Sequence, residues 1–471
     1  MSLACNATDS FGDLQERLDA HGQDRVLRFW STLDAAGRRS LTEQLLGLDL
    51  EALAQAWRRG SPVPGDLEPP LVERLPSHGG DEALLRRARE CGEARLAAGR
   101  VAALVVAGGQ GTRLGHGGPK GTLPLGPVSQ RSLLGLQAQK LRGLQRRYGR
   151  PVPWLVMTSS ATDLATRAFF SRQDHFGLDS SNVFFVVQRD APCLDFEGHL
   201  MLAAPHCLAW NPDGHGGVVA ALAESGVLED LGGRGIETLF YYQVDNPLVR
   251  IGDPALVGLH SLRGAEVTSK VVAKQRPDER VGTLGQRDGR LVVVEYTELT
   301  EPARSRRGAD GELAFWAGAI GIHALEVKFL ARVAERGDVA LPYHLSAKRI
   351  PSVDAAGRPL APAEPNGYKL ERFVFDALPL ARGAAAVEVK REEEYSPIKN
   401  TRGAESPDTA RRALSSCVRG WFAEAGVEAS GSAAIEVDHS RIDDAEDVRA
   451  LGIRQLAEAG DAVLIGPGDN V

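Results

Sequence analysis

Short runs of β-branched and aromatic residues alternate with stretches of helical periodicity from residue 101 onward. The run VAALVVAG is followed by the helical stretch SLLGLQAQKLRGLQRR, and the next apolar run is PWLVMTS. Such alternation is typical of βαβ units, whose parallel strands are buried on both faces of a sheet. We therefore predict an α/β fold with a central mixed, largely parallel sheet flanked by helices. The remaining strands are expected at 183–188, 236–246, 266–274, 290–299 and 313–323.

The two ends of the chain differ in pattern from this central region. Apolar residues recur at helical spacing over 13–58, five prolines in 61–76 favour an extended peptide, and a further helix is predicted over 81–99. The tail favours a helix at 408–425, the short strand IEVD, and a last helix at 444–458. We therefore predict three domains: a helical N-terminal segment over 1–99, a central domain over 100–385, and a small C-terminal α+β domain over 386–471.

The composition restricts the classes of partner. The 471 residues carry a formal net charge of −7, which argues against a surface that neutralises a nucleic-acid backbone. The five cysteines lie far apart without a C-x-x-C pair, which is typical of free thiols in a reducing cytosol. The first residues lack a basic segment followed by an apolar run, and no window approaches the roughly 18 apolar residues of a membrane span. We expect a cytoplasmic protein that binds neither nucleic acid nor membranes.

A glycine-rich segment, VVAGGQGTRLGHGGPKG at 105–121, includes the end of the first predicted strand and the loop after it. Its glycines lack a Cβ and let the backbone approach a phosphate, and successive N–H groups before a helix N-terminus form an anion cradle. That helix is expected to begin near Ser132, and Arg113 and Lys120 add two mobile positive charges to the loop. This combination predicts a triphosphate site.

Two better-known phosphate motifs do not fit this segment. A Walker A loop requires G-x-x-x-x-G-K-[ST], whereas Lys120 here follows Pro119. A dinucleotide-binding G-x-G-x-x-G fingerprint fails because Leu114 stands where the third glycine is needed. The next predicted strand also lacks the terminal acidic residue that would bind a ribose hydroxyl. The spacing therefore disfavours both a P-loop NTPase and an NAD-binding protein.

The pattern G-G-x-G-T-R-x-G-x₃-P-K resembles the signature of the sugar-nucleotide pyrophosphorylases. Its extended form is similar to that of the eukaryotic-type UDP-sugar pyrophosphorylases, closest to their UDP-N-acetylglucosamine branch, and the resemblance covers roughly residues 12–405. It implies a Rossmann-like nucleotidyltransferase fold for the central domain and a UTP:sugar-1-phosphate uridylyltransferase activity. It also implies catalytic roles for Arg113 and Lys120, and nucleotide contacts at Val106, Ala107, Gly108 and Gly109.

Three further segments resemble family elements that bind uridine and metal. Gln188 ends the run VFFVVQ, where the resemblance implies that its amide reads the uracil edge by donating to a carbonyl and accepting from the ring N–H. NPDGHGG is similar to a family loop that contacts base and sugar, with Gly214 in place and His215 where the family has asparagine. Asp245 ends an apolar strand in FYYQVDNPL, at the edge of the sheet where a carboxylate can hold Mg²⁺ together with substrate phosphates.

The resemblance also implies residues for the sugar and for the phosphates. Gly282 in ERVGTLG and the pair Glu295 and Tyr296 in VVVEYTEL would line the sugar site. FWAGAIGIH resembles a family strand, but Ala319 replaces its sugar-contacting asparagine. Two lysines follow, with Lys369 in NGYKLERFVFD implied to bind UTP phosphates and Lys399 in REEEYSPIKN implied to be catalytic, holding the sugar phosphate.

The reaction implied by the resemblance joins UTP to a sugar 1-phosphate with release of pyrophosphate, and Mg²⁺ is the expected cofactor. Because His215 and Ala319 depart from the family pattern, the sugar stays open between N-acetylglucosamine 1-phosphate or a related hexose 1-phosphate and, alternatively, glucose or galactose 1-phosphate. An alternative from another class is a UTP- or UDP-sugar-binding protein without catalysis. The expected partners are the two small-molecule substrates, and we expect a monomer, with a homodimer as the alternative.

Overall fold

The computed structural model describes residues 11–59, 67–296, 298–337, 341–427, 433–453 and 462–465. The chain forms two compact units that interleave in sequence. The first unit comprises Met1–Val63, Arg189–Gly217 and Arg336–Asp376. The second unit comprises Pro64–Gln188, Val218–Glu335 and Ala377–Val471.

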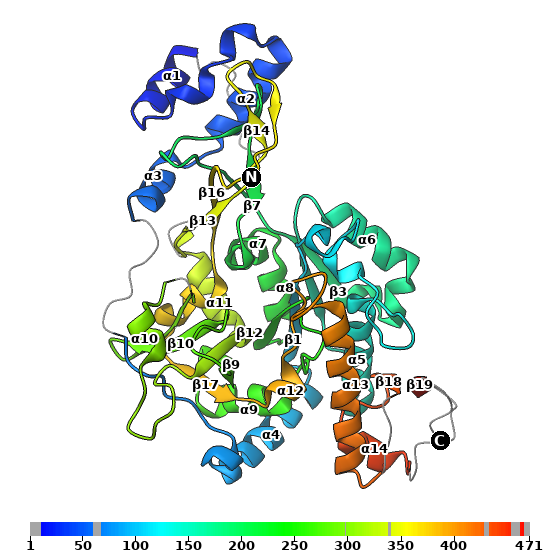
Figure 1. Ribbon diagram of the computed structural model, residues 1–471. Coiled ribbons are helices and arrows are strands. Elements are labelled where there is room, and N and C mark those ends of the chain that lie inside the picture. The colour runs from blue at the N-terminus through cyan, green and yellow to red at the C-terminus, as the bar shows by residue number, and fades with distance from the viewer. Residues whose placement is uncertain are drawn as a thin grey trace. The chain divides into compact units, whose positions relative to one another are not determined.

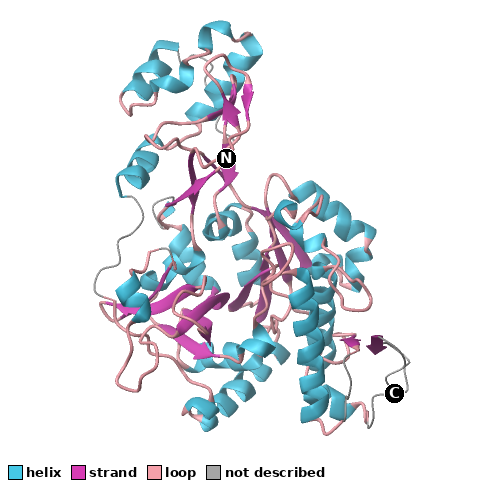
Figure 2. Cartoon of the chain, in the orientation of Figure 1, coloured by secondary structure: helices cyan, strands magenta, loops and turns pink. Residues whose placement is uncertain are grey.

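The second unit is built on a nine-stranded mixed sheet whose strands are enclosed by helices (Figure 2). Strands β8, β1, β2 and β3 are neighbours in that order and run parallel, and β17 runs parallel to β9. Strand β12 runs antiparallel to β8, β9 and β10, and β10 pairs antiparallel with β11. The predicted α/β fold with a mixed, largely parallel sheet is confirmed. The strands are β1 (Val101–Val106), β2 (Trp154–Thr158), β3 (Val183–Val187), β8 (Thr238–Gln243), β9 (Val267–Ala273), β10 (Gly282–Arg287), β11 (Arg290–Val294), β12 (Ala317–Glu326) and β17 (Ala384–Glu388).

Helices cover this sheet because its central strands are apolar on both faces. All five residues of β2 are buried, and β1 is buried over its first five. Helix α5 (Leu133–Tyr148) is capped by Ser132, whose hydroxyl accepts from the Gly135 N–H, and its first nine residues are all buried. The other helices are α4 (Glu82–Ala97), α6 (Asp163–Arg172), α7 (Val218–Glu224), α8 (Val227–Gly233), α9 (Pro254–Leu262), α10 (Glu301–Ser305), α11 (Val327–Ala334), α12 (Arg391–Glu394), α13 (Pro407–Glu424) and α14 (Ala445–Ala450).

Helices α4 and α9 lie side by side in the second unit (Figure 1). Gly92 faces the start of α9 so closely that a Cβ on it would lie 1.9 Å from the Pro254 carbonyl oxygen. A Cβ on Gly258 would lie 1.6 Å from the Ala88 carbonyl oxygen. The two helices can therefore approach this closely only because glycine occupies both contact positions.

The first unit combines three helices with short antiparallel strand pairs. Its core is formed by leucines from the helices packed on leucines of the strands, including Leu41, Leu45, Leu202 and Leu370. Its elements are α1 (Phe11–Asp19), α2 (Ala35–Leu46), α3 (Leu50–Arg59), β4 (Asp190–Pro192), β5 (Leu202–Ala204), β6 (Cys207–Leu208), β7 (Trp210–Pro212), β13 (His344–Lys348), β14 (Ser352–Val353), β15 (Pro359–Leu360) and β16 (Gly367–Glu371).

This division differs from the predicted domain boundaries at residues 99 and 385. Residues 189–217 and 336–376, placed by the sequence in the central domain, belong to the same unit as the N-terminal helices. The reason is that their short strands bury apolar side chains against those helices, a long-range contact that local patterns do not show. Residues 64–99 belong to the second unit, in which α4 packs on α9.

The C-terminal residues fold within the second unit around a small core of their own. Strand β18 (Ala434–Val437) pairs in parallel with β19 (Ala462–Ile465), and Phe422, Ile435 and Val448 are buried there. The last helix was expected over 444–458; α14 ends at Ala450, and residues 454–461 lie outside the described part.

Two further expectations concern membranes and thiols. Among the described helices, none combines the length and the apolar character that crossing a membrane requires.

Cys91, Cys193, Cys207 and Cys417 are free thiols, and Cys5 lies outside the described residues. Burial raises the pKa of Cys193 to about 11 and that of Cys417 to about 12, so both thiols are protonated at neutral pH.

Candidate active site

The glycine-rich loop after β1 folds back on itself. The Gly111 N–H donates to the Gly118 carbonyl at 2.9 Å, and the Lys120 N–H donates to the Gly109 carbonyl at 3.0 Å. Gly115 has φ +68°, a conformation that side chains rarely adopt. The consequence is that Gly109 and Lys120, eleven positions apart, are neighbours at the end of β1. Val106 closes the strand, and Ala107 is buried directly after it.

Gly108 and Gln188 meet at the ends of β1 and β3. A Cβ on Gly108 would lie 3.2 Å from Gln188 Oε1 and 3.3 Å from the Ser159 backbone nitrogen. The Gly108 carbonyl accepts from the Ser159 hydroxyl at 2.8 Å, and the Gln188 N–H donates to the Thr158 carbonyl at 3.0 Å. Gln188 is 6% exposed, so its amide is held in a largely dry setting beside the glycine loop. The structure thus brings Gly108, predicted to contact the nucleotide, next to Gln188, predicted to read the uracil edge.

Lys120 and Asp245 also meet, from the loops after β1 and β8. Lys120 Nζ lies 2.9 Å from Asp245 Oδ2, and the two side chains are 16% and 17% exposed. Because β1 and β8 are parallel neighbours, their carboxyl ends lie at the same edge of the sheet. The predicted phosphate-binding lysine and the predicted metal-binding carboxylate therefore share one location.

Lys399 lies beside this pair. The Ile398 N–H donates to the Asp245 carbonyl at 3.0 Å, and Lys399 Nζ lies 3.5 Å from Glu405 Oε1. Partial burial lowers the pKa of the Lys399 ammonium group, but interactions with Tyr395 and with the carboxylates of Glu405 and Asp245 outweigh this and raise the pKa above its ordinary value. Lys399 is therefore positively charged at neutral pH, as a group that binds a phosphate must be.

Arg113 is placed differently from the two lysines. It lies in the short 3₁₀ turn Thr112–Leu114 and its residue is exposed. Among the described residues it has no ion-pair partner. Arg113 is thus a charged side chain on the outer part of the loop, available to an anion from solvent.

Four residues predicted to line the sugar site lie on β10, β11 and β12 or just after them. Gly282 pairs with Ala319 across β10 and β12, and a Cβ on Gly282 would lie 3.7 Å from Glu295 Oε1. Glu295 and Tyr296 follow β11 directly, and both are partly buried. The structure therefore gathers Gly282, Glu295 and Ala319 in one place, with Tyr296 next in the chain.

The other three predicted residues belong to the first unit. Gly214 has φ +87°, and a Cβ there would lie 2.5 Å from the Arg372 carbonyl oxygen, so only glycine fits. His215 Nδ1 accepts from the Val374 N–H at 3.2 Å, and its ring stacks on Phe373 with centroids 5.2 Å apart. Lys369 lies on β16 opposite Ser346 of β13. The conformation of the NPDGHGG loop is thus fixed by backbone contacts to residues 372–374.

Asp213, in this same loop, is a residue that sequence reasoning missed. It is 1% exposed, and neither carboxylate oxygen accepts a hydrogen bond from a described residue. A Cβ on Gly217 would lie 2.0 Å from Asp213 Oδ1, and Arg372 lies 3.8 Å from Oδ2. Burial raises the pKa of Asp213 to about 7, although Arg372 and Arg189 lower it. The only feature of the sequence that could have indicated Asp213 is its position as a carboxylate in the glycine-rich stretch NPDGHGG.

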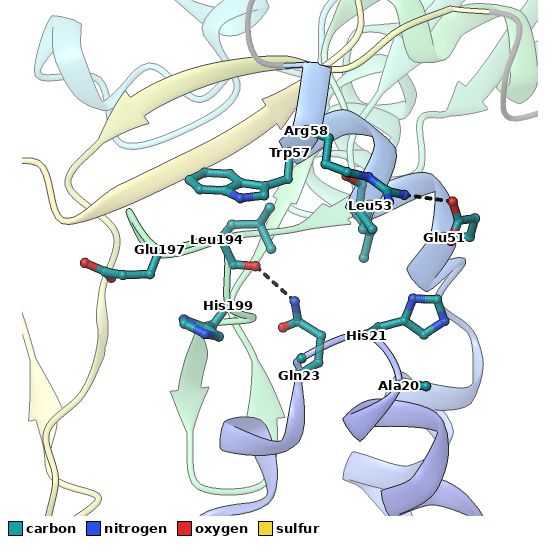
Figure 3. Close-up of a pocket in the computed structure, with 13 residues that line it drawn as sticks. Ala20, His21, Gln23, Glu51, Leu53, Trp57, Arg58, Leu194, Glu197 and His199 are labelled. Carbon is teal, nitrogen blue, oxygen red and sulfur yellow. Dashed lines mark hydrogen bonds and ion pairs between the residues drawn. The ribbon is translucent and has the colours of Figure 1, made fainter.

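A separate cavity of about 410 Å³ lies within the first unit (Figure 3). Gln23 Nε2 donates to the Gly198 carbonyl at 3.0 Å on one side of it, and Arg58 pairs with Glu51 at 2.9 Å on another. None of the predicted site residues lines this cavity. The nearby trio Asp195, Glu197 and His199 has its ligand atoms within 4.8 Å of one another, but Asp195 already accepts from the N–H groups of Glu197 and His199.

Comparison with known proteins agrees with this geometry. Residues 80–405 match the family described as UTP–glucose-1-phosphate uridylyltransferase. The chain is 40% identical to the UDP-N-acetylhexosamine pyrophosphorylase-like protein 1 of Mus musculus, over 89% of this chain and 86% of that protein. It is 37% identical to the UDP-N-acetylglucosamine pyrophosphorylase of Saccharomyces cerevisiae, over 72% of this chain and 73% of that protein.

A solved structure shares the fold over nearly the whole length. The crystal structure of the uridine diphosphate N-acetylglucosamine pyrophosphorylase of Trypanosoma brucei, in complex with inhibitor, superposes with a TM-score of 0.81 and 27% identity, covering 96% of this chain and 97% of that one. The fold and the loop at its sheet edge define a nucleotidyltransferase. The chain belongs to the UTP–glucose-1-phosphate uridylyltransferase family. The predicted family and the predicted class of activity, uridylyl transfer, are confirmed.

Proposed function

We propose that this protein transfers the uridylyl group of UTP to an N-acetylhexosamine 1-phosphate, yielding a UDP-sugar and pyrophosphate. The observation that carries the proposal is the cluster of Lys120, Asp245 and Lys399 at the carboxyl edge of β1 and β8. Two lysines beside one carboxylate suit a reaction in which two phosphate anions must approach each other. The names of the relatives support the choice of an N-acetylated sugar.

The proposed reaction is an in-line displacement. A phosphate oxygen of the sugar 1-phosphate attacks the α-phosphorus of UTP, a new P–O bond forms, and the bond between the α-phosphorus and the bridging oxygen breaks to release pyrophosphate. The attacking phosphate is already ionised, so no general base is needed. Positioning of the two anions and neutralisation of their charge are the protein's contributions.

Each residue of the cluster has a proposed role. Lys120 and Arg113 neutralise the leaving pyrophosphate, and Lys399 holds the phosphate of the attacking sugar. Gln188, held against Gly108, reads the uracil edge. Gly282, Glu295, Tyr296 and Ala319 line the place of the sugar.

Mg²⁺ is the proposed cofactor, and the donor set around Asp245 fits it. Mg²⁺ commonly takes one or two protein carboxylates and completes its shell with water and substrate phosphates. Asp245 offers such a carboxylate at the sheet edge, and among the described residues no group of three ligand side chains forms around it. Bound there, the ion would neutralise phosphate charge. Lys120, which pairs with Asp245 in this structure, is the neighbouring cation that would bind the pyrophosphate.

The sugar is tested by incubating the purified protein with UTP, Mg²⁺ and each of four sugar 1-phosphates: N-acetylglucosamine, N-acetylgalactosamine, glucose and galactose. Pyrophosphate release is measured. We expect the N-acetylated sugars to be used with the highest kcat/KM. Exclusive use of glucose 1-phosphate would overturn the choice of sugar, and UTP binding without pyrophosphate release from any of the four would favour a binding protein.

We also infer that the protein acts in the cytoplasm, in keeping with the four free thiols of the described residues.

A further inference from the structure

The C-terminal part of the second unit contacts the turn at 126–131, between Lys120 and helix α5. Glu436 lies on β18 and is 4% exposed. Its Oε2 accepts from the N–H groups of Val128 and Ser129 at 2.7 and 2.8 Å, and its Oε1 accepts from the Ser129 hydroxyl at 2.5 Å. A buried carboxylate with three donors from one turn is a strong, directional contact. It links residues more than 300 positions apart in the chain.

The turn that Glu436 holds is shaped around the carboxylate. The N–H groups of Leu125 and Gly126 both donate to the Arg131 carbonyl at 2.9 Å, which closes the turn. A Cβ on Gly126 would lie 2.9 Å from Glu436 Oε1, and Gln130 is held at φ +56°. A non-glycine residue in this conformation persists only where its surroundings impose it. Glu436 supplies part of that constraint.

This turn connects the phosphate loop to helix α5. Upstream, the Leu123 N–H donates to the Lys120 carbonyl at 3.1 Å; downstream, the Leu133 N–H donates to the Leu123 carbonyl at 3.1 Å. A second side chain from the C-terminal part, Arg411 of α13, donates to the Pro124 carbonyl at 3.1 Å. Movement of the turn would therefore move the backbone of Lys120.

Helix α5 extends the same connection to Asp245. The Gln137 amide donates to the Val244 carbonyl at 3.2 Å, and Lys140 donates to the carbonyls of Pro247 and Val249 at 2.8 Å each. These carbonyls flank Asp245. At the far end of α5, Arg147 is paired with Asp444 at 2.6 Å. The C-terminal part thus contacts α5 at its end and the turn before its start.

We propose that Glu436 is a positioning residue for the reaction: by fixing the turn at 126–131, the C-terminal part sets the place of Lys120 relative to Asp245. The catalytic side of this proposal rests on the proposed function. Glu436 touches no substrate and acts through the turn. The chain beyond the family match at residue 405 then contributes to turnover as well as to folding.

The test compares Glu436→Ala, Glu436→Gln and the control Asp444→Asn in the full chain. Asp444 is also a C-terminal carboxylate that contacts an α5 arginine, but it lies at the other end of the helix. We expect Glu436→Ala to lower kcat by at least about tenfold with little change in KM for UTP, since small displacements of catalytic groups cost this much. Glu436→Gln, which keeps an acceptor oxygen, should recover part of the loss. Asp444→Asn should lower Tm while kcat stays within about twofold of the parent.

A second readout does not depend on activity. Amide hydrogen exchange over residues 120–131 should accelerate in Glu436→Ala and remain unchanged in Asp444→Asn. Ser129→Ala, which removes one hydrogen bond from the opposite side, replaces Glu436→Ala if that variant fails to fold. Unchanged exchange and kcat in a folded Glu436 or Ser129 variant would overturn the proposal. Absence of turnover in the parent protein would contradict the proposed function, while the exchange experiment would still decide the positioning role.

Discussion

Lys120 Nζ lies 2.9 Å from Asp245 Oδ2, so a positive and a negative side chain neutralise each other at the edge of the sheet. If Asp245 binds Mg²⁺, its replacement must remove the metal dependence of turnover. We expect Asp245→Asn to lower kcat by about 100-fold or more, because an amide is a poor ligand for a hard cation and the phosphate charge is no longer offset. Pyrophosphate release titrated against Mg²⁺ measures this. An Asp245→Asn protein with the parent's Mg²⁺ curve would place the metal elsewhere.

Lys399 should act on the sugar phosphate and leave UTP binding nearly intact. We expect Lys399→Ala to lower turnover by two or more orders of magnitude, since the charge that holds the nucleophile is lost. Lys390→Ala is the matched control, because Lys390 lies nearby in sequence with an exposed side chain that pairs with Glu393. Calorimetry with UTP and steady-state kinetics separate the two effects. An equal loss of UTP affinity in Lys399→Ala would contradict the assigned role.

Gln188 should determine the choice of base. Gln188→Glu replaces the amide N–H₂ donor by a carboxylate that only accepts, so one hydrogen bond to uracil is replaced by repulsion. We expect the ratio of kcat/KM for UTP over CTP to fall by roughly 100-fold. Gln173→Glu, at the C-terminus of α6, controls for the added charge. An unchanged preference for UTP over CTP in Gln188→Glu would show that Gln188 does not read the base.

Asp213 should make stability depend on pH near neutrality. Its folded pKa of about 7 exceeds the ordinary value of 3.8, so the native state binds this proton more tightly than the unfolded state. The contribution of this proton to the free energy of unfolding is therefore fully present below about pH 4. It is lost as the pH rises through about 7, and the loss is at most roughly 4 kcal/mol. In Asp213→Asn the side chain does not titrate, so the free energy of unfolding should fall less between pH 5.5 and 8.5 than in the parent. Urea unfolding at pH 5.5 and 8.5 measures this loss of stability, with Asp230→Asn, an exposed carboxylate on α8, as the control. The same pH dependence in parent and Asp213→Asn would refute the assignment.

Local patterns predicted most of the sheet and part of the site. Alternating runs gave the strands β1, β2, β3, β8 and β9 within a few residues, because buried parallel strands are continuous apolar segments. The shared edge of parallel strands explains why Gly108 meets Gln188 and Lys120 meets Asp245. These contacts follow from the parallel order of the strands, which places their carboxyl ends at one edge of the sheet.

Other features depend on contacts between distant segments and left no local trace. One such contact is the hydrogen bond from the Val374 N–H to His215. Another is the hydrogen bond from the 126–131 turn to the carboxylate of Glu436, more than 300 residues away. Nothing in the sequence marks Asp213 as buried, and only its packing against Gly217 shows it. The membership of residues 189–217 in the first unit has the same origin.

The first unit is assembled from three separate stretches, the last of which ends at Asp376. During synthesis, helices α1 to α3 leave the ribosome long before the strands that cover their leucines. At ribosomal rates of about 5–20 residues per second, the interval from residue 59 to residue 376 lasts tens of seconds. The strands of residues 189–217 can cover part of this apolar surface early, but the rest stays exposed until residues 336–376 are made, and we expect chaperones that recognise apolar surface to bind the nascent chain in that interval.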